Sequence, residues 1–220
     1  SGRCLRYGRY RMADWSRLYE HRKSVAARYP AGIWSVPIAK RYHTVLEPIG
    51  TRGTRVLEVG AGARGLRKRL SGAWGDVSYV SCDIDRSTPH DFHDIEDVTG
   101  VFDLVVGLEV IEHLSLESAM RLVERAHALL VDGGVIALTT PNTFYPPAYL
   151  RDATHVTPFC FDELGGVLLA GGFEVSAVYR LHHDALLKKA LKRTLLYPLY
   201  RVLGIDFAHQ IMVVGRKAAG

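Results

Sequence analysis

The sequence is poor in cysteine and contains no long apolar run. Its three cysteines, Cys4, Cys82 and Cys160, are odd in number and lack the spacing of zinc ligands, so we expect neither a disulfide framework nor a zinc centre. The longest apolar runs, such as 134–138 and 165–170, are far shorter than the roughly 20 residues that cross a bilayer. The first residues lack the pattern of a signal peptide. These absences predict a cytoplasmic protein in a reducing compartment.

The excess of positive charge is also small. The 220 residues include 28 lysines and arginines and 23 aspartates and glutamates, which gives a net charge of +5. Such an excess is compatible with an anionic partner but does not by itself indicate nucleic-acid binding. Hydrophobic residues make up 48% of the chain, and no repeat or low-complexity stretch divides it. We therefore expect a single domain spanning 1–220, in which aromatic-rich helices at 10–48 cap the substrate site.

Apolar segments of strand length alternate with helical patterns from residue 55 onward. We expect strands at 55–59, 77–82, 102–107, 134–139, 173–181 and 210–216, and helices at 63–70, 116–130 and 162–170. This alternation predicts an α/β fold, with a largely parallel sheet and helices on both of its faces. Asp132-Gly133-Gly134 follows the apolar stripe of the helix at 116–130 and is expected to end that helix.

A glycine-rich turn follows the first strand of this pattern. Gly60, Gly62 and Gly65 have the G-x-G-x-x-G spacing that lets a ligand approach the backbone where a helix begins. Asp83 ends the next strand, where its carboxylate can accept both ribose hydroxyls of an adenosine. This combination predicts a nucleotide site, although an NAD-dependent oxidoreductase would share it.

Glu58 distinguishes between the two cofactors. It lies at the carboxyl end of the first expected strand, where an acid opposes a cationic group rather than a pyrophosphate. S-adenosylmethionine has an ammonium and a sulfonium but no phosphate, so Glu58 favours this cofactor over NAD. The alternative for Glu58 is an exposed acid or an ion pair with Arg64 or Lys68.

Several motifs together resemble the class I S-adenosylmethionine-dependent methyltransferases. They are VLEVGAGARG (56–65), SCDID (81–85), HDIED (93–97), FDLVVGLEVIEHL (102–114), DGGVIALTTPN (132–142) and GGFEV (171–175). The resemblance extends from 56 to the end of the chain. It implies a Rossmann-like, doubly wound, mostly parallel seven-stranded sheet with an antiparallel C-terminal strand. It also implies a set of cofactor-binding residues: Glu58, Gly60, Ala61, Gly62, Gly65, Asp83, Ile84, Asp94, Ile95 and Glu109.

The same resemblance suggests how the cofactor would be held. The glycines would cradle its methionine part and Asp83 its ribose, while Ile84 and Ile95 would enclose the adenine. Asp94 would accept a hydrogen bond from the adenine amine. The chain departs from the family because the stretch between Asp83 and Asp94 is too short for the usual helix. This leaves open whether Asp94 or Asp91 contacts the adenine.

The segment EVIEH is unusually rich in potential metal ligands. Glu109, Glu112 and His113 follow the fourth strand, where two carboxylates and an imidazole can hold a divalent cation. EVIEH resembles the E-x-x-E-H motif of the metal-dependent small-RNA 3'-terminal 2'-O-methyltransferases and of the ubiquinone-biosynthesis O-methyltransferases. In the RNA family, a histidine after a T-P-N turn completes the site, and here His155 follows Thr140-Pro141-Asn142. We therefore expect these four residues to bind Mg²⁺ or Mn²⁺.

Two features leave the metal interpretation open. The phenylalanine-rich segment that follows the last histidine of the RNA enzymes is not recognisable at 156–164. Without metal, the acid would cap a helix, and His113 or His155 would act as the catalytic base.

A metal site would indicate the kind of acceptor. A cation that chelates two adjacent oxygens activates a hydroxyl, so we expect a sugar hydroxyl of an oligosaccharide or a glycolipid. The alternatives are the terminal ribose of an RNA, which is disfavoured by the small basic excess, and a catechol- or quinone-type small molecule. Outside this reaction class, an NAD-dependent oxidoreductase and a non-catalytic cofactor-binding module remain.

A basic stretch precedes the last expected strand. We expect a helical insertion at 184–204, in which leucines recur every four residues with cations between them. It would pack on the sheet with a solvated basic side, or touch a membrane surface or an acidic substrate through 186–203. The neighbouring pair His182-His183 is expected to face solvent.

Overall fold

The structure is a computed structural model and describes residues 12–182, 192 and 194–219. Much of the basic stretch expected to form a helix, 183–191 together with 193, lies outside the described residues. In the part that the structure describes, no helix is long and apolar enough to cross a bilayer.

A seven-stranded mixed sheet forms the centre of the molecule. Its strands lie in the order β1-β6-β7-β5-β4-β2-β3. The strands are β1 (Ile38–Ala39), β2 (Arg55–Val59), β3 (Ser78–Cys82), β4 (Phe102–Leu108), β5 (Leu130–Pro141), β6 (Phe173–Leu181) and β7 (Gln210–Lys217). β7 pairs antiparallel with both β5 and β6, and the other pairs are parallel. The predicted Rossmann-like sheet with an antiparallel C-terminal strand is therefore confirmed.

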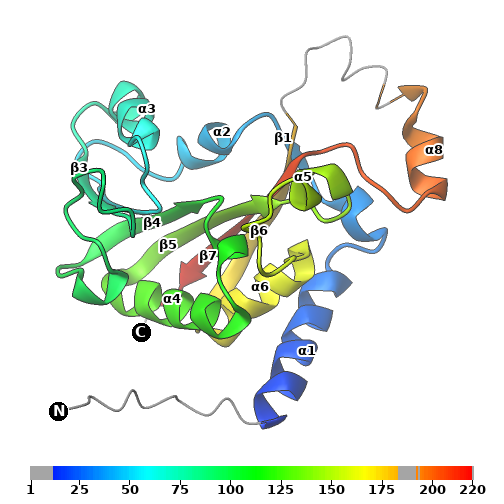
Figure 1. The fold of residues 1–220 in the computed structure, drawn as a ribbon, viewed down its shortest axis with the longest axis horizontal. Coiled ribbons are helices and arrows are strands. Elements are labelled where there is room, and N and C mark those ends of the chain that lie inside the picture. The colour runs from blue at the N-terminus through cyan, green and yellow to red at the C-terminus, as the bar shows by residue number, and fades with distance from the viewer. Residues whose placement is uncertain (1–11, 183–191, 193, 220) are drawn as a thin grey trace.

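Helices cover both faces of this sheet (Figure 1). One face carries α4 (Leu116–Leu129) and α6 (Phe161–Ala170), against which α1 (Met12–Ala27) packs; the other carries α2 (Tyr42–Leu46) and α3 (Gly65–Trp74). The short helices are η1 (Gly32–Ser35), η2 (Ile95–Asp97), η3 (Ile111–His113), α5 (Pro146–Leu150) and α8 (Tyr197–Val202).

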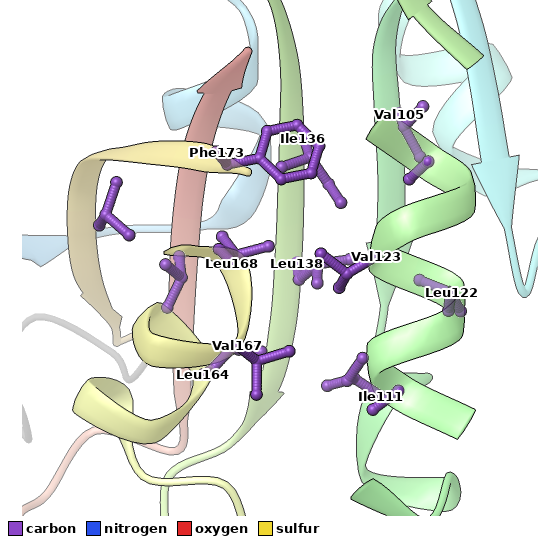
Figure 2. Close-up of a cluster of buried hydrophobic side chains, with 14 of the residues drawn as sticks. Val105, Ile111, Leu122, Val123, Ile136, Leu138, Leu164, Val167, Leu168 and Phe173 are labelled. Atoms are coloured by element: carbon purple, nitrogen blue, oxygen red, sulfur yellow. The ribbon is translucent and has the colours of Figure 1, made fainter. Parts of the chain in front are cut away.

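The larger core lies between the sheet and α4 and α6. Figure 2 shows side chains of α6, such as Val167, and of α4, such as Val123, meeting Ile136 and Leu138 of β5. The apolar stripe read from the sequence is the buried side of α4. This packing holds the helices rigidly against the strands whose carboxyl ends carry the candidate site.

The expectation about the end of the helix at 116–130 is wrong. β5 begins at Leu130, directly after α4, so Asp132-Gly133-Gly134 lies in the strand and does not end the helix. Gly133 has φ 73°, and the pairing of β4 with β5 shifts register between Phe102 and Leu104, so the glycines serve an irregularity in the strand.

The segment before the glycine turn also differs in part from the sequence pattern. It contains α1 and α2, as expected, but β1 separates α2 from η1 and pairs with β6. Val36 has an extended backbone because Pro37 follows it, and this prevents one helix from running through the segment.

The prediction that His182 faces solvent is wrong, because its side chain is fully buried. It packs on the ring of Phe207 beside a buried ion pair between Arg180 and Asp206. Its neighbour His183 lies outside the described residues.

Candidate active site

The glycine turn joins β2 to α3 at the carboxyl end of the sheet. Gly60 and Gly62 have φ 71° and 42°, a region that favours glycine. A Cβ atom at Gly60 would also clash with the side chain of Val110, which follows β4. Gly60 therefore allows the turn to pass close to the segment that carries Glu109 and Glu112.

Asp83 joins the end of β3 to this turn. Its Oδ2 accepts a hydrogen bond from the backbone N–H of Gly62 at 2.8 Å, and its Oδ1 accepts one from Asp85 N–H at 2.9 Å. A carboxylate offers about four acceptor positions, so two remain for the ribose hydroxyls of a nucleoside. The geometry suits the role that the resemblance implies.

Glu58 is buried within the sheet layer, facing α3. Its Oε2 accepts a short hydrogen bond from the hydroxyl of Tyr79 on β3. Burial raises the pKa of Glu58 to about 7; the Tyr79 hydrogen bond opposes that rise and the charge of Asp83 adds to it. The alternatives of an exposed acid and of an ion pair with Arg64 or Lys68 do not describe this residue.

The short stretch after β3 contains no α-helix and touches β3 through one isolated parallel bridge, between Cys82 and Phe92. Asp91 holds this stretch in place, because its Oδ2 accepts from both the N–H and the hydroxyl of Ser81, at 2.8 and 2.6 Å. These hydrogen bonds lower the pKa of Asp91.

Asp94 caps η2 by accepting from Glu96 N–H through Oδ1. Of the two candidate adenine contacts, Asp94 is favoured over Asp91, because Asp91 already accepts two hydrogen bonds from Ser81 whereas Asp94 accepts one from Glu96. Ile84 is almost fully exposed and Ile95 is partly buried in η2, so apolar surface is available on this side of the turn.

Glu109 follows β4 in a strained backbone conformation. Its φ is 55°, which is uncommon for a residue other than glycine and costs about 1–2 kcal/mol. Its N–H donates to the hydroxyl of Thr139 at 3.0 Å, and this bond holds the strained turn. Burial raises the pKa of the Glu109 carboxyl, while the side chains of Gln210 and Thr139 oppose the rise.

Glu112, His113 and His155 form a compact cluster. One ligand atom from each lies within 4.8 Å of the others. The loop that carries His155 is attached directly to η3, because the carbonyl of Glu112 accepts from Val156 N–H at 2.7 Å and from Thr157 N–H at 3.0 Å. These two backbone hydrogen bonds bring the distant histidine to the E-H pair.

The carboxylate of Glu112 is poorly compensated. It is fully buried, and neither oxygen has a hydrogen-bond partner among the described residues. Burial, together with the nearby charge of Glu109, raises its pKa to about 8, although the side chain of Thr140 and the backbone of Glu112 oppose the rise. Glu112 is therefore protonated at neutral pH unless a cation lies beside it.

Neither histidine forms a hydrogen bond at Nε2 in the described part of the chain, although Nε2 of His155 lies 3.9 Å from Oδ2 of Asp152. Nδ1 of His155 lies 2.7 Å from the carbonyl of Tyr149, and Nδ1 of His113 lies 3.2 Å from the carbonyl of Thr154. A carbonyl only accepts, so the proton of each neutral ring belongs on Nδ1 and the lone pair on Nε2. This is the tautomer in which Nε2 binds a cation, with a carbonyl fixing the ring from behind.

The structure therefore brings together three of the four predicted metal ligands. Glu109 is outside the group of three, although His113 and His155 are near enough for their charges to lower its pKa. No sequence pattern indicates the supporting residues, which are Thr139, Tyr149, Thr154 and Gln210. Tyr149 and Thr154 contribute backbone carbonyls, which any residue type would supply.

The comparisons with known proteins agree with this geometry. The model of a family described as a methyltransferase domain matches residues 33–178. The sequence matches none of the curated proteins. Because the family match covers well over half of the chain, it shows the family and removes the hydride-transfer alternative.

Three solved structures illustrate the fold. An S-adenosylmethionine-dependent methyltransferase from Archaeoglobus fulgidus superposes with a TM-score of 0.62 at 17% identity, over 95% of this chain and 100% of that one. One from Mesorhizobium loti gives 0.58 at 15%, over 79% and 96%. A phosphoethanolamine N-methyltransferase from Haemonchus contortus, in complex with S-adenosylmethionine, gives 0.55 at 14%, over 80% and 51%.

At these identities the superpositions establish the fold alone, and the family match carries the assignment. The glycine turn and Asp83 then have the form that the cofactor of this family requires. The chain belongs to the methyltransferase domain family, and the protein is an S-adenosylmethionine-dependent methyltransferase.

Proposed function

We propose that the protein is a metal-assisted O-methyltransferase acting on a sugar hydroxyl of an oligosaccharide or a glycolipid. The observation that carries the proposal is the buried carboxylate of Glu112, which lacks a partner among the described residues and lies beside two imidazoles. Leaving such a group unpaired costs on the order of several kcal/mol. A bound divalent cation would remove this cost, because Glu112 would be ionised beside it and Nε2 of each histidine would be a ligand.

The donor set suits Mg²⁺ or Mn²⁺. Carboxylate oxygens favour hard cations, and the two imidazoles make Mn²⁺ the better match of these two. We include Glu109 as a fourth ligand, because its Oε1 is buried without a partner in the described part of the chain. Its proximity to His113 and His155 supports this role.

Different residues would hold the cofactor and the acceptor. A cation bound to the cluster would act as a Lewis acid and lower the pKa of an acceptor hydroxyl, which is otherwise a poor nucleophile. The glycine turn and Asp83 hold the cofactor, while Glu112, His113 and His155 orient the acceptor side. Methyl transfer is an in-line displacement, so the main task of the chain is to align the acceptor oxygen at about 3 Å from the methyl carbon.

The cation site also supports an oxygen acceptor over other nucleophiles. An amine or a thiol attacks a sulfonium-bound methyl group without a metal, whereas a hydroxyl beside a second oxygen gains both activation and a fixed position by chelation. Leu150, at the end of α5, and Val156, next to His155, are both exposed. They would suit an acceptor with an apolar part, such as a glycolipid.

A chelator tests the metal without altering the chain. We expect it to abolish turnover while the affinity for S-adenosylhomocysteine, measured by calorimetry, stays nearly unchanged. Added Mn²⁺ should restore turnover. Full activity in chelator would overturn the metal and leave His113 or His155 as the general base.

Direct binding of Mn²⁺ gives a readout that is independent of turnover. Glu112 is protonated at pH 7 in the metal-free protein, since its pKa is about 8. Binding should therefore release about one proton. Calorimetry in buffers of different ionisation enthalpy measures this release, and Glu112→Gln should remove both the release and most of the affinity.

An acceptor screen tests the substrate class. Sugars and glycolipids with adjacent hydroxyls should be methylated in a metal-dependent way. Metal-dependent methylation of a 3'-terminal RNA ribose, or of a catechol- or quinone-type compound, would keep the metal and replace the acceptor. Metal-independent methylation of an amine would reject the proposal as a whole.

A further inference from the structure

A ridge of exposed apolar side chains lies just before the last strand. Leu195, Leu199, Val202 and Leu203, called the apolar ridge here, are between 54% and 84% exposed. They account for four of the nine large apolar side chains that are exposed in the described part of the chain, within nine residues. Leu199 and Val202 lie on α8, and Leu195 and Leu203 lie in the turns before and after it.

The exposure is not caused by a detached segment. The opposite side of α8 is held against the domain, with the guanidinium of Arg201 5.0 Å from the ring of Trp34 and the ring of Tyr200 5.9 Å from that of Phe207. Trp34 also donates from Nε1 to the carbonyl of Ile205 at 3.1 Å. The apolar ridge is thus directed outward by a fixed helix, which lies at one end of the molecule in Figure 1.

The sequence that leads into the ridge is rich in positive charge, and the acids nearest to it are Asp184 and Asp206. Between 185 and 205 there are five lysines and arginines and no aspartate or glutamate. Leucines recur every four residues from Leu187 to Leu203. Cations alternating with aliphatic side chains are typical of segments that lie in the interface of an anionic bilayer. The family match ends at residue 178, so this feature is additional to the matched region.

The ridge is linked to the edge of the sheet that carries the catalytic cluster. Asp206 N–H donates to the carbonyl of Phe144 at 2.7 Å, and Asp206 Oδ2 accepts from Asn142. The segment starting at Asn142 leads through α5 to His155, and Leu150 and Val156 are exposed along it. Exposed apolar side chains therefore accompany both the ridge and the loop of the site.

We propose that the apolar ridge inserts into the headgroup region of a lipid bilayer, and that the positive charge of the sequence leading into it makes an anionic bilayer the preferred one. The site would then face acceptors carried by the membrane, and this second step rests on the proposed function. Lipid binding itself does not depend on the metal or on the acceptor.

Other occupants fit the charge less well. A second copy of the chain seated on the ridge would bring five cations of each copy together without an acid between 185 and 205 to compensate them. A nucleic acid would match the cations but would leave the aliphatic ridge without a partner. An anionic bilayer satisfies both components.

Sedimentation of the full chain with vesicles tests the proposal. The protein should bind vesicles that contain phosphatidylglycerol and bind pure phosphatidylcholine vesicles at least about tenfold more weakly. Raised salt should weaken binding to the anionic vesicles. Equal binding to both kinds of vesicle, or binding to neither, would overturn the proposal.

Single substitutions locate the contact. Val202→Asp and Leu199→Asp should each weaken vesicle binding by about tenfold or more. Each replaces an apolar contact with the bilayer by a negative charge that the anionic lipids repel. Val101→Asp is the matched control, since Val101 is 49% exposed and is not part of the ridge; it should bind normally. Calorimetry with S-adenosylhomocysteine checks that every variant is folded.

Two further outcomes separate this proposal from its rivals and from the proposed function. A dimer seen by analytical ultracentrifugation and lost in Val202→Asp would mean that the ridge covers a second copy, which would overturn lipid binding. Glu112→Gln should still bind vesicles fully. A failure of the metal hypothesis would therefore leave this result intact, and the reverse also holds.

Discussion

The two halves of the active site satisfy their buried polar groups in different ways. In the cofactor half, the carboxylates have partners within the chain: Asp83 accepts from Gly62 and Asp85, and Glu58 accepts from Tyr79. In the acceptor half, Glu112 has none among the described residues. The carboxylates of the cofactor half thus have their partners on folding, whereas burial of the Glu112 carboxylate has a free energy cost that a cation would lower.

This difference suggests a general way to read such sites. Carboxylates that already have partners hold their shape before the ligand binds. A buried carboxylate without a partner indicates that a charged ligand binds beside it. Substitutions in the two halves should therefore affect different measurements. Those in the cofactor half should alter cofactor affinity, and those in the acceptor half should alter metal binding and turnover.

The largest effect is expected for Glu112→Gln. We expect turnover to fall by about a thousandfold or more, because the variant cannot supply the negative charge that the cation requires. The affinity for S-adenosylhomocysteine, measured by calorimetry, should change little. Glu117→Gln is the matched control, since Glu117 forms only an exposed ion pair with Arg121. A large loss of cofactor affinity in Glu112→Gln would contradict the division into two halves.

The next effect concerns Asp83. Asp83→Ala should lower cofactor affinity by at least about a hundredfold, because it removes two charge-assisted hydrogen bonds of about 1.5–3 kcal/mol each. Mn²⁺ binding should be retained. Asp85→Ala keeps the backbone N–H that Asp83 accepts and serves as the control. Glu58→Gln should reduce affinity less than Asp83→Ala, and the opposite order would mean that their roles are reversed.

A smaller effect is expected behind the cluster. The hydroxyl of Thr154 lies 3.0 Å from Nδ1 of His113 and donates to Asp152 at 2.7 Å. Thr154→Val should lower Mn²⁺ affinity by about tenfold, since groups behind a metal-binding imidazole fix its orientation. Thr154→Ser should restore it. Unchanged Mn²⁺ affinity in the valine variant would show that the carbonyl of Thr154 is sufficient.

Sequence reasoning reached the cofactor half more fully than the acceptor half. The alternation of strands and helices predicts the sheet, because hydrophobic periodicity is a local property, and Asp83 follows from its place at a strand end. The contact of His155 with η3 depends on hydrogen bonds that the carbonyl of Glu112 accepts from the N–H groups of Val156 and Thr157, which no side-chain pattern encodes. His155 was found only through a resemblance.

Errors in the prediction have the same physical origin. His182 was expected in solvent because two adjacent histidines are polar, yet tertiary packing on Phe207 buries it. Asp132-Gly133-Gly134 has the composition of a helix end, but pairing with β4 draws the chain into a strand from Leu130. In both cases a contact distant in sequence overrides a local preference.

The smallest effect, a pH dependence of stability, compares the two halves directly. The pKa of Glu112 is raised from 4.5 to about 8, and that of Glu58 to about 7. Below about pH 4.5 both groups are protonated in the folded and the unfolded chain. As the pH rises further, the unfolded chain loses these protons first, so each group makes the metal-free protein less stable until the pH passes its folded pKa.

Between about pH 7 and pH 8, only Glu112 should make the metal-free protein still less stable as the pH rises. Thermal melting of metal-free protein should show Glu112→Gln stabilised relative to wild type by at least about 3 °C at pH 8, which corresponds to about 1 kcal/mol. The stability of Glu58→Gln relative to wild type should rise up to about pH 7 and stay constant above that pH. Mn²⁺ should stabilise wild type at pH 8 and leave Glu112→Gln unaffected. If Mn²⁺ stabilised both proteins equally, the cation would bind elsewhere and the unpartnered carboxylate would need another explanation.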